Sequence, residues 1–229
     1  TLGVYGFVNA GDNVSVTATF SEAVIVDNAS GNPTLTLVVG SDNRTATYTS
    51  GDNSTALVFR YTIRAGDNAS NGISILGNTL ALNSSTIKDA ALNNAILTHS
   101  EVSDNNGYIV DTTPPTVSSV AITSATNKQY SLVNATDVVL VTATFSETPI
   151  SAVIVESGTA TLTLVVGSAN RTATLHSGSS TIVSGSDNAS LVFRYTIQAT
   201  GTSGENDDDG ISIPANALNS GSITIRDPA

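Results

Sequence analysis

The sequence predicts an all-β protein built from two tandem β-sandwich domains. The first observation is internal repetition, because VSVTATFSE from Val14 recurs as VLVTATFSE from Val139, and further matched blocks follow in the same order. The second is a period-two alternation of apolar and polar residues within these blocks, which is typical of strands with one buried face. The third is the absence of a sustained apolar stripe at helical spacing. Each copy is therefore expected to fold as one unit of strands.

The matched blocks give the expected strands in chain order. Residues 14–20 form the first alternating block, residues 33–47 contain the next strands, and residues 57–63 form another, with GISI and IKD segments after it. The spacing between the copies grows from 125 residues at Phe20 and Phe145 to 138 residues at Gly72 and Gly210. The added residues fall in stretches rich in Ser, Gly and Asn, where loops tolerate insertion. The blocks between them are therefore expected to be secondary structure.

About seven strands in a unit of roughly 110 to 125 residues favour a sandwich of immunoglobulin type. We expect one immunoglobulin-like repeat over residues 1–113 and a second over residues 114–229. Thr1 aligns with Thr126, so the first copy lacks its first strand, and the second copy lacks a counterpart of residues 91–113, its last strands. Pro114 and Pro115 stiffen the join, which predicts an elongated rod.

The composition argues against several classes of partner. The chain has a formal net charge of −11, only 8 Lys and Arg residues, and no Cys, Met or Trp. Strong acidity disfavours nucleic acid and anionic membrane surfaces as partners. No apolar run is long enough to insert across a bilayer. The absence of Cys gives no support to a zinc or redox site.

Catalysis is not expected. His99 and His176 do not align between the copies, neither lies beside a nucleophile motif, and no phosphate-binding glycine loop is present. Binding of glycans is a weaker alternative, because most aromatic residues recur in both copies, and the Phe59 and Tyr61 pairs share a face with Leu and Ile, which is typical of a core. The aromatic residues left over are Phe7, Tyr48 and Tyr108.

Calcium is the cofactor for which the sequence offers ligands. Glu205, Asp207 and Asp209 stand at alternate positions before Gly210, which is the spacing of a calcium loop that begins with a carboxylate. The Glu expected at the twelfth position is replaced by Asn216. The aligned loop of the first copy, residues 67–72, carries fewer carboxylates. The alternative interpretation is a solvated acidic turn.

A second candidate calcium site lies at the join between the domains. Asp111, Glu147 and Asp227 are expected to converge where one sandwich meets the next, and Glu22 and Asp89 hold the equivalent places in the first copy. A divalent cation would turn the mutual repulsion of such carboxylates into a clamp. Exposed turn residues are the alternative interpretation. Further oxygen ligands could come from residues 104–106, which are Asp104, Asn105 and Asn106.

Asparagine occurs in many Asn-x-Ser/Thr sequences. The main interpretation is turn chemistry, because Asn tolerates left-handed backbone conformations and hydrogen-bonds its own backbone. The alternative is N-glycosylation, which would coat the protein in sugar. The candidate residues are Asn13, Asn28, Asn43, Asn53, Asn68, Asn83, Asn134, Asn170 and Asn188.

The ordered set of motifs resembles the tandem bacterial immunoglobulin-like repeats of large surface adhesins. The motifs are VDTTPPTV, VTATFSE, LTLVVGSxNRTAT, LVFRYTI, NGISI and IKDAALNNAxLTHS, and together they cover essentially the whole chain. The resemblance implies an extracellular spacer at the cell surface that projects a binding tip, often stiffened by calcium. The implied partners are neighbouring repeats in the same chain or in adjacent subunits, with glycans as a further candidate.

A filament is the alternative function. An incomplete sandwich that exposes a strand edge can accept a strand from a neighbouring molecule, as in donor-strand filaments. In a spacer, by contrast, the strand would come from the same polypeptide. The chain would then be a subunit of an extracellular filament or surface layer.

We predict that calcium raises the melting temperature of this two-repeat chain and narrows its distribution of end-to-end lengths, because bound cations hold carboxylates together only in the folded state. Thermal unfolding and small-angle scattering with calcium, and again with a chelator, measure the two effects. Identical curves under both conditions would exclude a calcium role.

Overall fold

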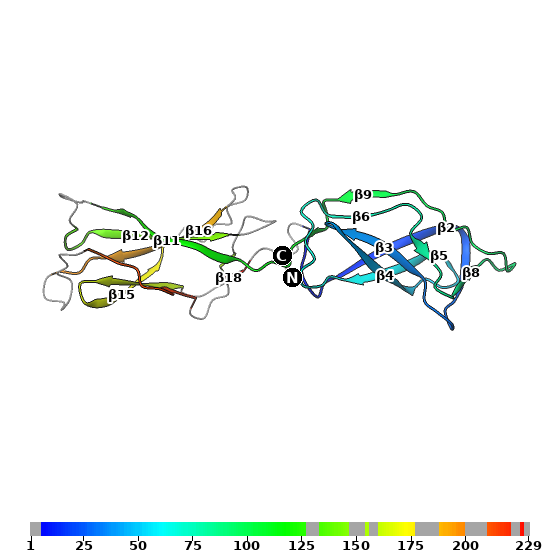
Figure 1. Ribbon diagram of the computed structural model, residues 1–229, viewed down its shortest axis with the longest axis horizontal. Coiled ribbons are helices and arrows are strands. Elements are labelled where there is room, and N and C mark those ends of the chain that lie inside the picture. Colours follow the sequence, from blue (N-terminus) through cyan, green and yellow to red (C-terminus); the bar gives the residue numbers. More distant parts are fainter. Residues whose placement is uncertain are drawn as a thin grey trace. The chain divides into compact units, whose positions relative to one another are not determined.

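The computed structural model describes residues 6–126, 133–146, 154–155, 160–176, 188–199, 210–220 and 225–226. These residues form β-strands in several sheets and no helix, an all-β architecture consistent with a β-sandwich (Figure 1). No helix long and apolar enough to cross a membrane occurs among them. The chain separates into two compact units, with the boundary between Thr113 and Pro114. We call the first unit 1 and the second unit 2.

Unit 1 is built around one sheet with the strand order β8-β2-β5-β4-β3-β6-β9, in which β7 also pairs with β3. A separate pair joins β1 to β10 in parallel. The strands are β1 (Phe7–Val8), β2 (Asn13–Asp27), β3 (Thr34–Val39), β4 (Asp42–Ser50), β5 (Ser54–Thr62), β6 (Ile73–Ile75), β7 (Leu80–Ala81), β8 (Thr86–Lys88), β9 (Val102–Asn105) and β10 (Ile109–Val110).

Strand β2 changes partner along its length. Its first half pairs with β5, and the register breaks between Thr19 and Val24. Beyond the break, residues Ile25–Asp27 pair with β8 instead. An interruption of this kind bends and twists a strand, so β2 connects two parts of the sheet that face a common core.

The β3–β4 hairpin shows why its turn contains glycine. Val39 pairs directly with Asp42, so the turn has two central residues, and Gly40 takes the first place with φ +62°. Ser41, the second central residue, does not have a positive φ. This combination is that of a type II′ turn, which suits the twist of paired strands. A Cβ atom at Gly40 would also lie 2.2 Å from the carbonyl oxygen of Asn68. The second copy repeats the turn, with Gly167 at φ +60°.

Unit 2 contains a sheet with the order β11-β12-β16-β15-β14-β17 and a separate pair of β13 with β18. The strands are β11 (Thr116–Ala125), β12 (Val138–Ser146), β13 (Ile154–Val155), β14 (Thr161–Val166), β15 (Ala169–Leu175), β16 (Asn188–Thr196), β17 (Leu218–Asn219) and β18 (Ile225–Arg226). The β13–β18 pair places Ile154 opposite Arg226, as β2 and β8 place Ile25 opposite Lys88. The two copies therefore share strand register as well as sequence.

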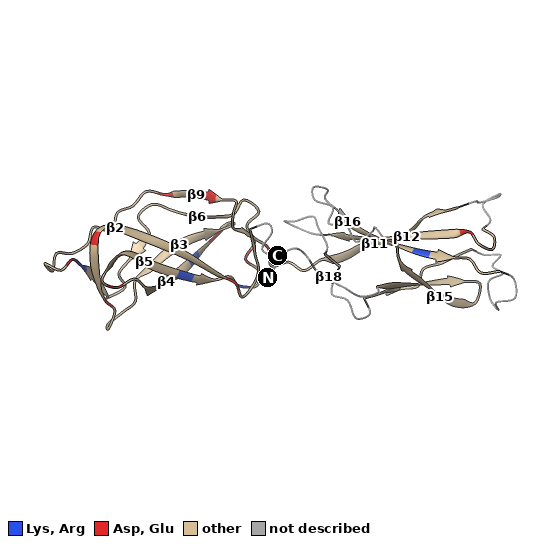
Figure 2. Cartoon of the chain, turned by 180° about the vertical axis from the view of Figure 1, so that it is seen from behind, with Lys and Arg blue, Asp and Glu red and all other residues tan. Residues whose placement is uncertain are grey.

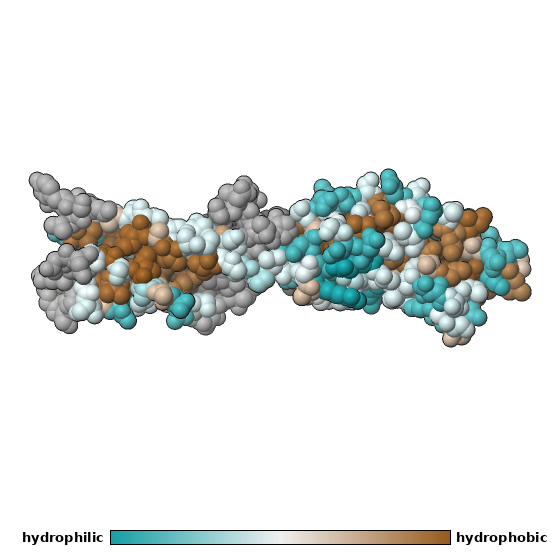
Figure 3. Space-filling view, viewed as in Figure 1, coloured by the Kyte–Doolittle hydropathy of each residue, from teal (hydrophilic) through white to brown (hydrophobic). Residues whose placement is uncertain are grey.

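The surfaces of both units combine sparse charge with exposed apolar patches. Few Lys, Arg, Asp or Glu residues lie on the strands (Figure 2). Hydrophobic residues reach the surface between more hydrophilic regions (Figure 3). The most exposed of the large apolar residues are Leu92 and Ile96, at 72% and 82% of their full accessibility. Among the described residues, the acidic residues on strands are Glu22, Asp27, Asp42 and Asp104, and the other acidic residues lie in loops and turns.

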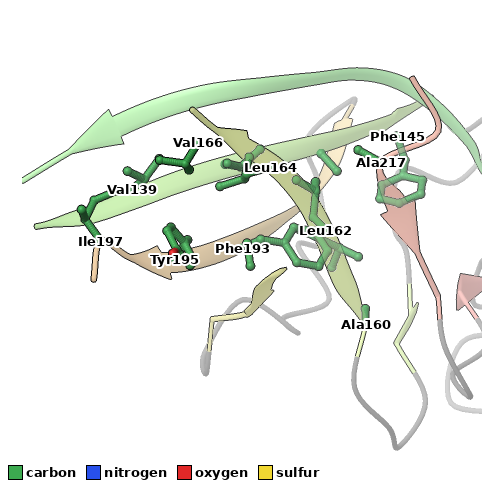
Figure 4. Close-up of a cluster of buried hydrophobic side chains, with 14 residues drawn as sticks. Val139, Phe145, Ala160, Leu162, Leu164, Val166, Phe193, Tyr195, Ile197 and Ala217 are labelled. Carbon is green, nitrogen blue, oxygen red and sulfur yellow. The ribbon is translucent and has the colours of Figure 1, made fainter. Parts of the chain in front are cut away.

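Each unit has its own hydrophobic core. In unit 1 the alternate residues of β3 and β5, such as Leu37, Leu57 and Phe59, are fully buried. In unit 2 the matching residues Leu164, Leu191 and Phe193 form the corresponding cluster (Figure 4). The structure therefore confirms the strands predicted from period-two alternation in these blocks.

Removal of the matched core leucines is predicted to cost each unit a similar amount. Leu37→Ala and Leu164→Ala each delete a side chain with no exposed surface, so each should destabilise its own unit by about 2–5 kcal/mol. Thr45→Ala, at an exposed position on β4, is the control and should change stability by less than about 0.5 kcal/mol. Denaturant unfolding of the whole chain would measure this. A change in only one of the two leucine variants would show that the copies do not share a core.

Candidate functional site

The clearest polar cluster in unit 1 surrounds the carboxylate of Asp67, in the turn that follows β5. Asp67 is 1% exposed, and both of its oxygens accept hydrogen bonds. The hydroxyl of Tyr61 donates to Oδ2 at 2.5 Å, and the backbone N–H of Arg64 donates to the same oxygen at 2.9 Å. Arg44 of β4 donates through Nε to Oδ1 at 2.7 Å. The cluster therefore ties β4, β5 and the following turn together.

The cluster shifts the pKa of its members in a consistent way. Burial alone would raise the pKa of the Asp67 carboxyl, but the hydrogen bonds from Tyr61, the Arg64 N–H and Arg44 outweigh burial and lower it. The hydrogen bond to Asp67 raises the pKa of Arg44, and burial, followed by that carboxylate, raises the pKa of Tyr61. Asp67 is thus held as an anion and Arg44 as a cation. Such an arrangement fastens a turn and supplies no free acid, base or nucleophile.

The loop aligned with the predicted calcium loop is occupied by structural hydrogen bonds in the first copy. Asp67 pairs with Arg44, and the Asn68 side chain accepts the Thr112 N–H at 2.9 Å and donates to the Thr113 hydroxyl at 3.1 Å. Backbone bonds in both directions join Ala69 to Val110. A cation at Asp67 would have to compete with the guanidinium of Arg44.

The calcium ligands predicted in the second copy, Glu205, Asp207 and Asp209, lie outside the described residues. Aligning the two copies places Arg171 at the position of Arg44, Tyr195 at that of Tyr61 and Glu205 at that of Asp67. The residue types of the Asp67 cluster therefore occur in both copies. Sequence reasoning missed this pattern because it considered the acidic residues as metal ligands and did not consider the arginine that recurs with them in both copies.

The carboxylates predicted at the domain join are placed only in part. Asp111 is fully buried directly after β10, where its Oδ1 accepts the Thr113 N–H at 3.0 Å. Glu147 and Asp227 lie outside the part of the chain that the structure describes. Within that part, no group of three or more His, Asp or Glu residues is arranged to hold a metal ion.

The equivalents named in the first copy are engaged differently. Glu22 and Asp89 line the same cavity of unit 1. Hydrogen bonds from the side chain and backbone of Asn93 lower the pKa of Asp89. Asp104 accepts a hydrogen bond from Asn71, and Asn105 closes its own turn by accepting the Gly107 N–H at 3.0 Å, while Asn106 is exposed.

Most of the candidate glycosylation residues lie on the surface and several serve in turns. The side chains of Asn13, Asn28, Asn43, Asn53, Asn68, Asn83, Asn134 and Asn170 belong to exposed residues, and the side chain of Asn188 lies outside the described part. Asn53 and Asn83 have φ of 57° and 51°, the left-handed conformation that Asn tolerates. The side-chain nitrogen of Asn83 donates to the Asn32 carbonyl and the Thr34 hydroxyl. The predicted turn role is therefore visible at these two residues.

The histidine in unit 1 has a structural position. His99 Nε2 accepts the Thr79 N–H at 3.0 Å, so Nδ1 carries the proton and faces the Ser100 carbonyl at 2.9 Å. The His99 N–H donates to the Asn78 side chain. These bonds hold the segment before β9 against the turn between β6 and β7. No nucleophilic side chain is hydrogen-bonded to the ring among the described contacts.

The leftover aromatic residues are mostly packed. Tyr48 is half-buried and meets Phe59 edge-on, with ring centroids 6.0 Å apart. Phe7 is also half-buried, in β1. Tyr108 is 43% exposed. The described part of the chain therefore presents little aromatic surface on which a sugar could stack.

A cavity of about 580 Å³ opens in unit 1 beside β2. Val16, Ala18 and Phe20 of β2 form one wall, and residues 93–100 form another. Glu22, Asp89 and His99 are the ionisable groups that line it. The sequence did not predict this cavity, because its walls come from segments that are far apart in the chain.

No protein-family model matches this chain, and no curated protein matches its sequence.

Disruption of the Asp67 cluster is predicted to destabilise unit 1. Asp67→Asn leaves Arg44 without its charged partner. The pair is part-buried, because the Arg44 side chain is 26% exposed, so the loss should cost about 1–3 kcal/mol. Asp42→Asn is the matched control, because Asp42 binds the other side of Arg44 at 2.9 Å but is 56% exposed in its side chain; its loss should cost less than about 1 kcal/mol. Equilibrium unfolding of both variants would test this, and equal effects would contradict it.

The same cluster predicts the direction of acid sensitivity. Because the pKa of Asp67 is lower in the folded state than in the unfolded chain, its contribution is fully present above about pH 5 and is lost as the pH falls through the folded-state value. Asp67→Asn should therefore flatten the acid limb of the stability profile below about pH 4.

Proposed function

We propose that this chain is a non-catalytic structural element, two tandem immunoglobulin-like β-sandwich repeats that act as a spacer in an extracellular cell-surface protein. The observation that carries the proposal is that the residues retained between the copies serve the core and the turns. Leu37 and Leu164 occupy matching buried positions, as do Phe59 and Phe193. A unit whose core residues recur in both copies is suited to a mechanical role. The arrangement of the repeats as a rod belongs to this proposal.

The polar groups of unit 1 support the same interpretation. The buried carboxylate of Asp67 fastens a turn to Arg44, and His99 fastens a segment to the turn before β7. Each is occupied by hydrogen bonds that hold loops in place. Active sites, by contrast, collect groups with pKa values displaced toward proton transfer near neutral pH. The shifts at Asp67 and Arg44 run the other way, because both reinforce the charged form.

Calcium and sugar remain part of the proposal as modifiers of the spacer. Glu205, Asp207 and Asp209 supply the ligand spacing for a cation in the second copy. The exposed Asn-x-Ser/Thr sites would carry glycans on the outer surface of the units. Both would stiffen or shield a spacer without changing its role.

The second candidate function is a subunit of an extracellular filament or surface layer. The observation that favours it is the edge of β2, which has no paired strand beyond it over residues 14–20 in the described structure. A spacer and a filament differ in where the missing strand comes from. A carbohydrate-binding module is the weaker third candidate, supported only by the cavity and the exposed ring of Tyr108.

The spacer function predicts two independent mechanical units. Pulling the whole chain from its ends in a force spectrometer should give two unfolding events, each releasing roughly 35–40 nm, because an extended residue spans about 3.3–3.6 Å. Both events should return after relaxation. Leu37→Ala should lower the force of one event only, and Leu164→Ala that of the other.

One shared unfolding event, or events that do not recover, would contradict the spacer function. A glycan array separates the third candidate from it. Calcium-independent binding to one polysaccharide would favour the carbohydrate-binding module.

A further inference from the structure

The same strand sequence occupies two different surroundings in this chain. Strand β12 of unit 2 pairs with β16 on one side and with β11 on the other. Strand β2 of unit 1 carries the matching sequence and pairs with β5 in the same way. On its other side, over residues 14–20, no strand of the described structure is paired with it. Unit 2 therefore serves as an internal reference for what unit 1 lacks.

The difference in neighbours changes the burial of identical side chains. Val141 and Ala143 are fully buried in unit 2, and Phe145 is 3% exposed. Their counterparts Val16, Ala18 and Phe20 are only half-buried. These three residues line the cavity of about 580 Å³. The sequence is the same, so the missing cover is the reason for the exposure.

The edge of β2 that faces away from β5 presents backbone N–H and C=O groups that can pair with another strand. The Ile63 N–H donates to the carbonyl of Asp12, so in an antiparallel ladder the polar backbone groups of Ser15, Thr17 and Thr19 point away from β5. In unit 2 the same side of β12 is hydrogen-bonded, at Val138 and Thr144, which are the counterparts of Asn13 and Thr19. The Thr126 N–H donates to the Val138 carbonyl at 2.9 Å, and the Ser118 hydroxyl donates to the Thr144 carbonyl at 3.0 Å.

Large apolar side chains are exposed at the cavity beside β2. Ile96 and Val102 both line it, and they are 82% and 51% exposed. In unit 2, strand β11 packs Val120 and Ala125 against the core. Strand β11 has no charged residue, which suits the apolar side chains of Val16, Ala18 and Phe20 in the cavity wall.

We propose that the 14–21 edge of β2 is an acceptor site for an antiparallel β-strand of the β11 type, supplied by an adjacent repeat unit. Unit 2 supplies the register. The residue equivalent to Val120 lies opposite Ala18, and the residue equivalent to Ala125 lies opposite Val14. The incoming strand bonds to Ser15, Thr17 and Thr19 and closes the cavity with its apolar side chains.

The connectivity of the chain shows how such a strand is presented. Strand β11 reaches unit 2 directly from the end of unit 1, through Thr113 and Pro114. A strand of the same type, at the start of an adjacent repeat unit, is therefore the occupant that fits the edge of β2. This choice of occupant rests on the proposed tandem-repeat function, whereas the acceptor site itself rests on the geometry of β2.

A peptide with the sequence of residues 114–126 tests the site in the whole chain. The labelled peptide should bind saturably in fluorescence anisotropy. Amide hydrogen exchange at Ser15, Thr17 and Thr19 should slow at least tenfold, because these N–H groups gain partners. A peptide carrying Val120→Asp should bind at least tenfold more weakly, and a scrambled peptide should not bind.

Two protein variants form a matched pair. Thr17→Pro removes a backbone donor that points away from β5 and should weaken peptide binding at least tenfold. Thr17→Ala keeps that donor and should bind as the natural chain does. If the proline variant fails to fold, the Val120→Asp peptide tests the same contact on the unaltered protein.

Three results would overturn the proposal. The first is equal binding of the natural and scrambled peptides, or no binding. The second is slowed exchange at Leu140, Thr142 and Thr144 in place of the unit 1 edge. The third is self-association of the chain alone that the peptide abolishes, which would make a second copy the occupant. The force experiment that tests the spacer function does not depend on the edge of β2. The spacer function and the acceptor site can therefore fail independently of each other.

Discussion

The antiparallel pairing of β2 with β5 is the interaction on which the rest of unit 1 depends. It sets Val16 opposite Phe59 and so directs one apolar face of each strand into the core. The turn after β5 then brings Asp67 to Arg44, and the far side of β2 becomes the exposed edge. The same pairing recurs between β12 and β16, where Val141 lies opposite Phe193. The two copies are therefore built around the same antiparallel strand pair.

Several carboxylates of unit 1 are stabilised by hydrogen bonds from neighbouring groups. The chain has few cations, yet Arg44 is placed between a buried carboxylate and an exposed one. Asp111 has no exposed surface and accepts the backbone N–H of Thr113. Asp89 accepts two hydrogen bonds from Asn93. In each case the carboxylate stabilises a turn, so a high count of acidic residues is not in itself a count of metal ligands.

The sequence anticipated the strands of the matched blocks and the core residues on their apolar faces, because the side chains of a strand alternate from one residue to the next. It was less informative about carboxylates. The spacing of Asp67 and its neighbours is compatible with a cation or with a buried ion pair. The partner that decides between them, Arg44, lies 23 residues away on another strand. The role of His99 depended likewise on Thr79, which the fold brings to it from across a turn.

The sequence by itself therefore determined the repetition, the strands and the inward-facing residues, since these follow from patterns local to each segment. The tertiary structure alone decided which carboxylates are bound by neighbouring groups and where the cavity beside β2 opens. Val16 and Val141 stand in nearly identical sequences, yet one lines a cavity and the other is fully buried. The difference is whether another strand covers this edge. The sequence of one strand does not specify which strand pairs beside it.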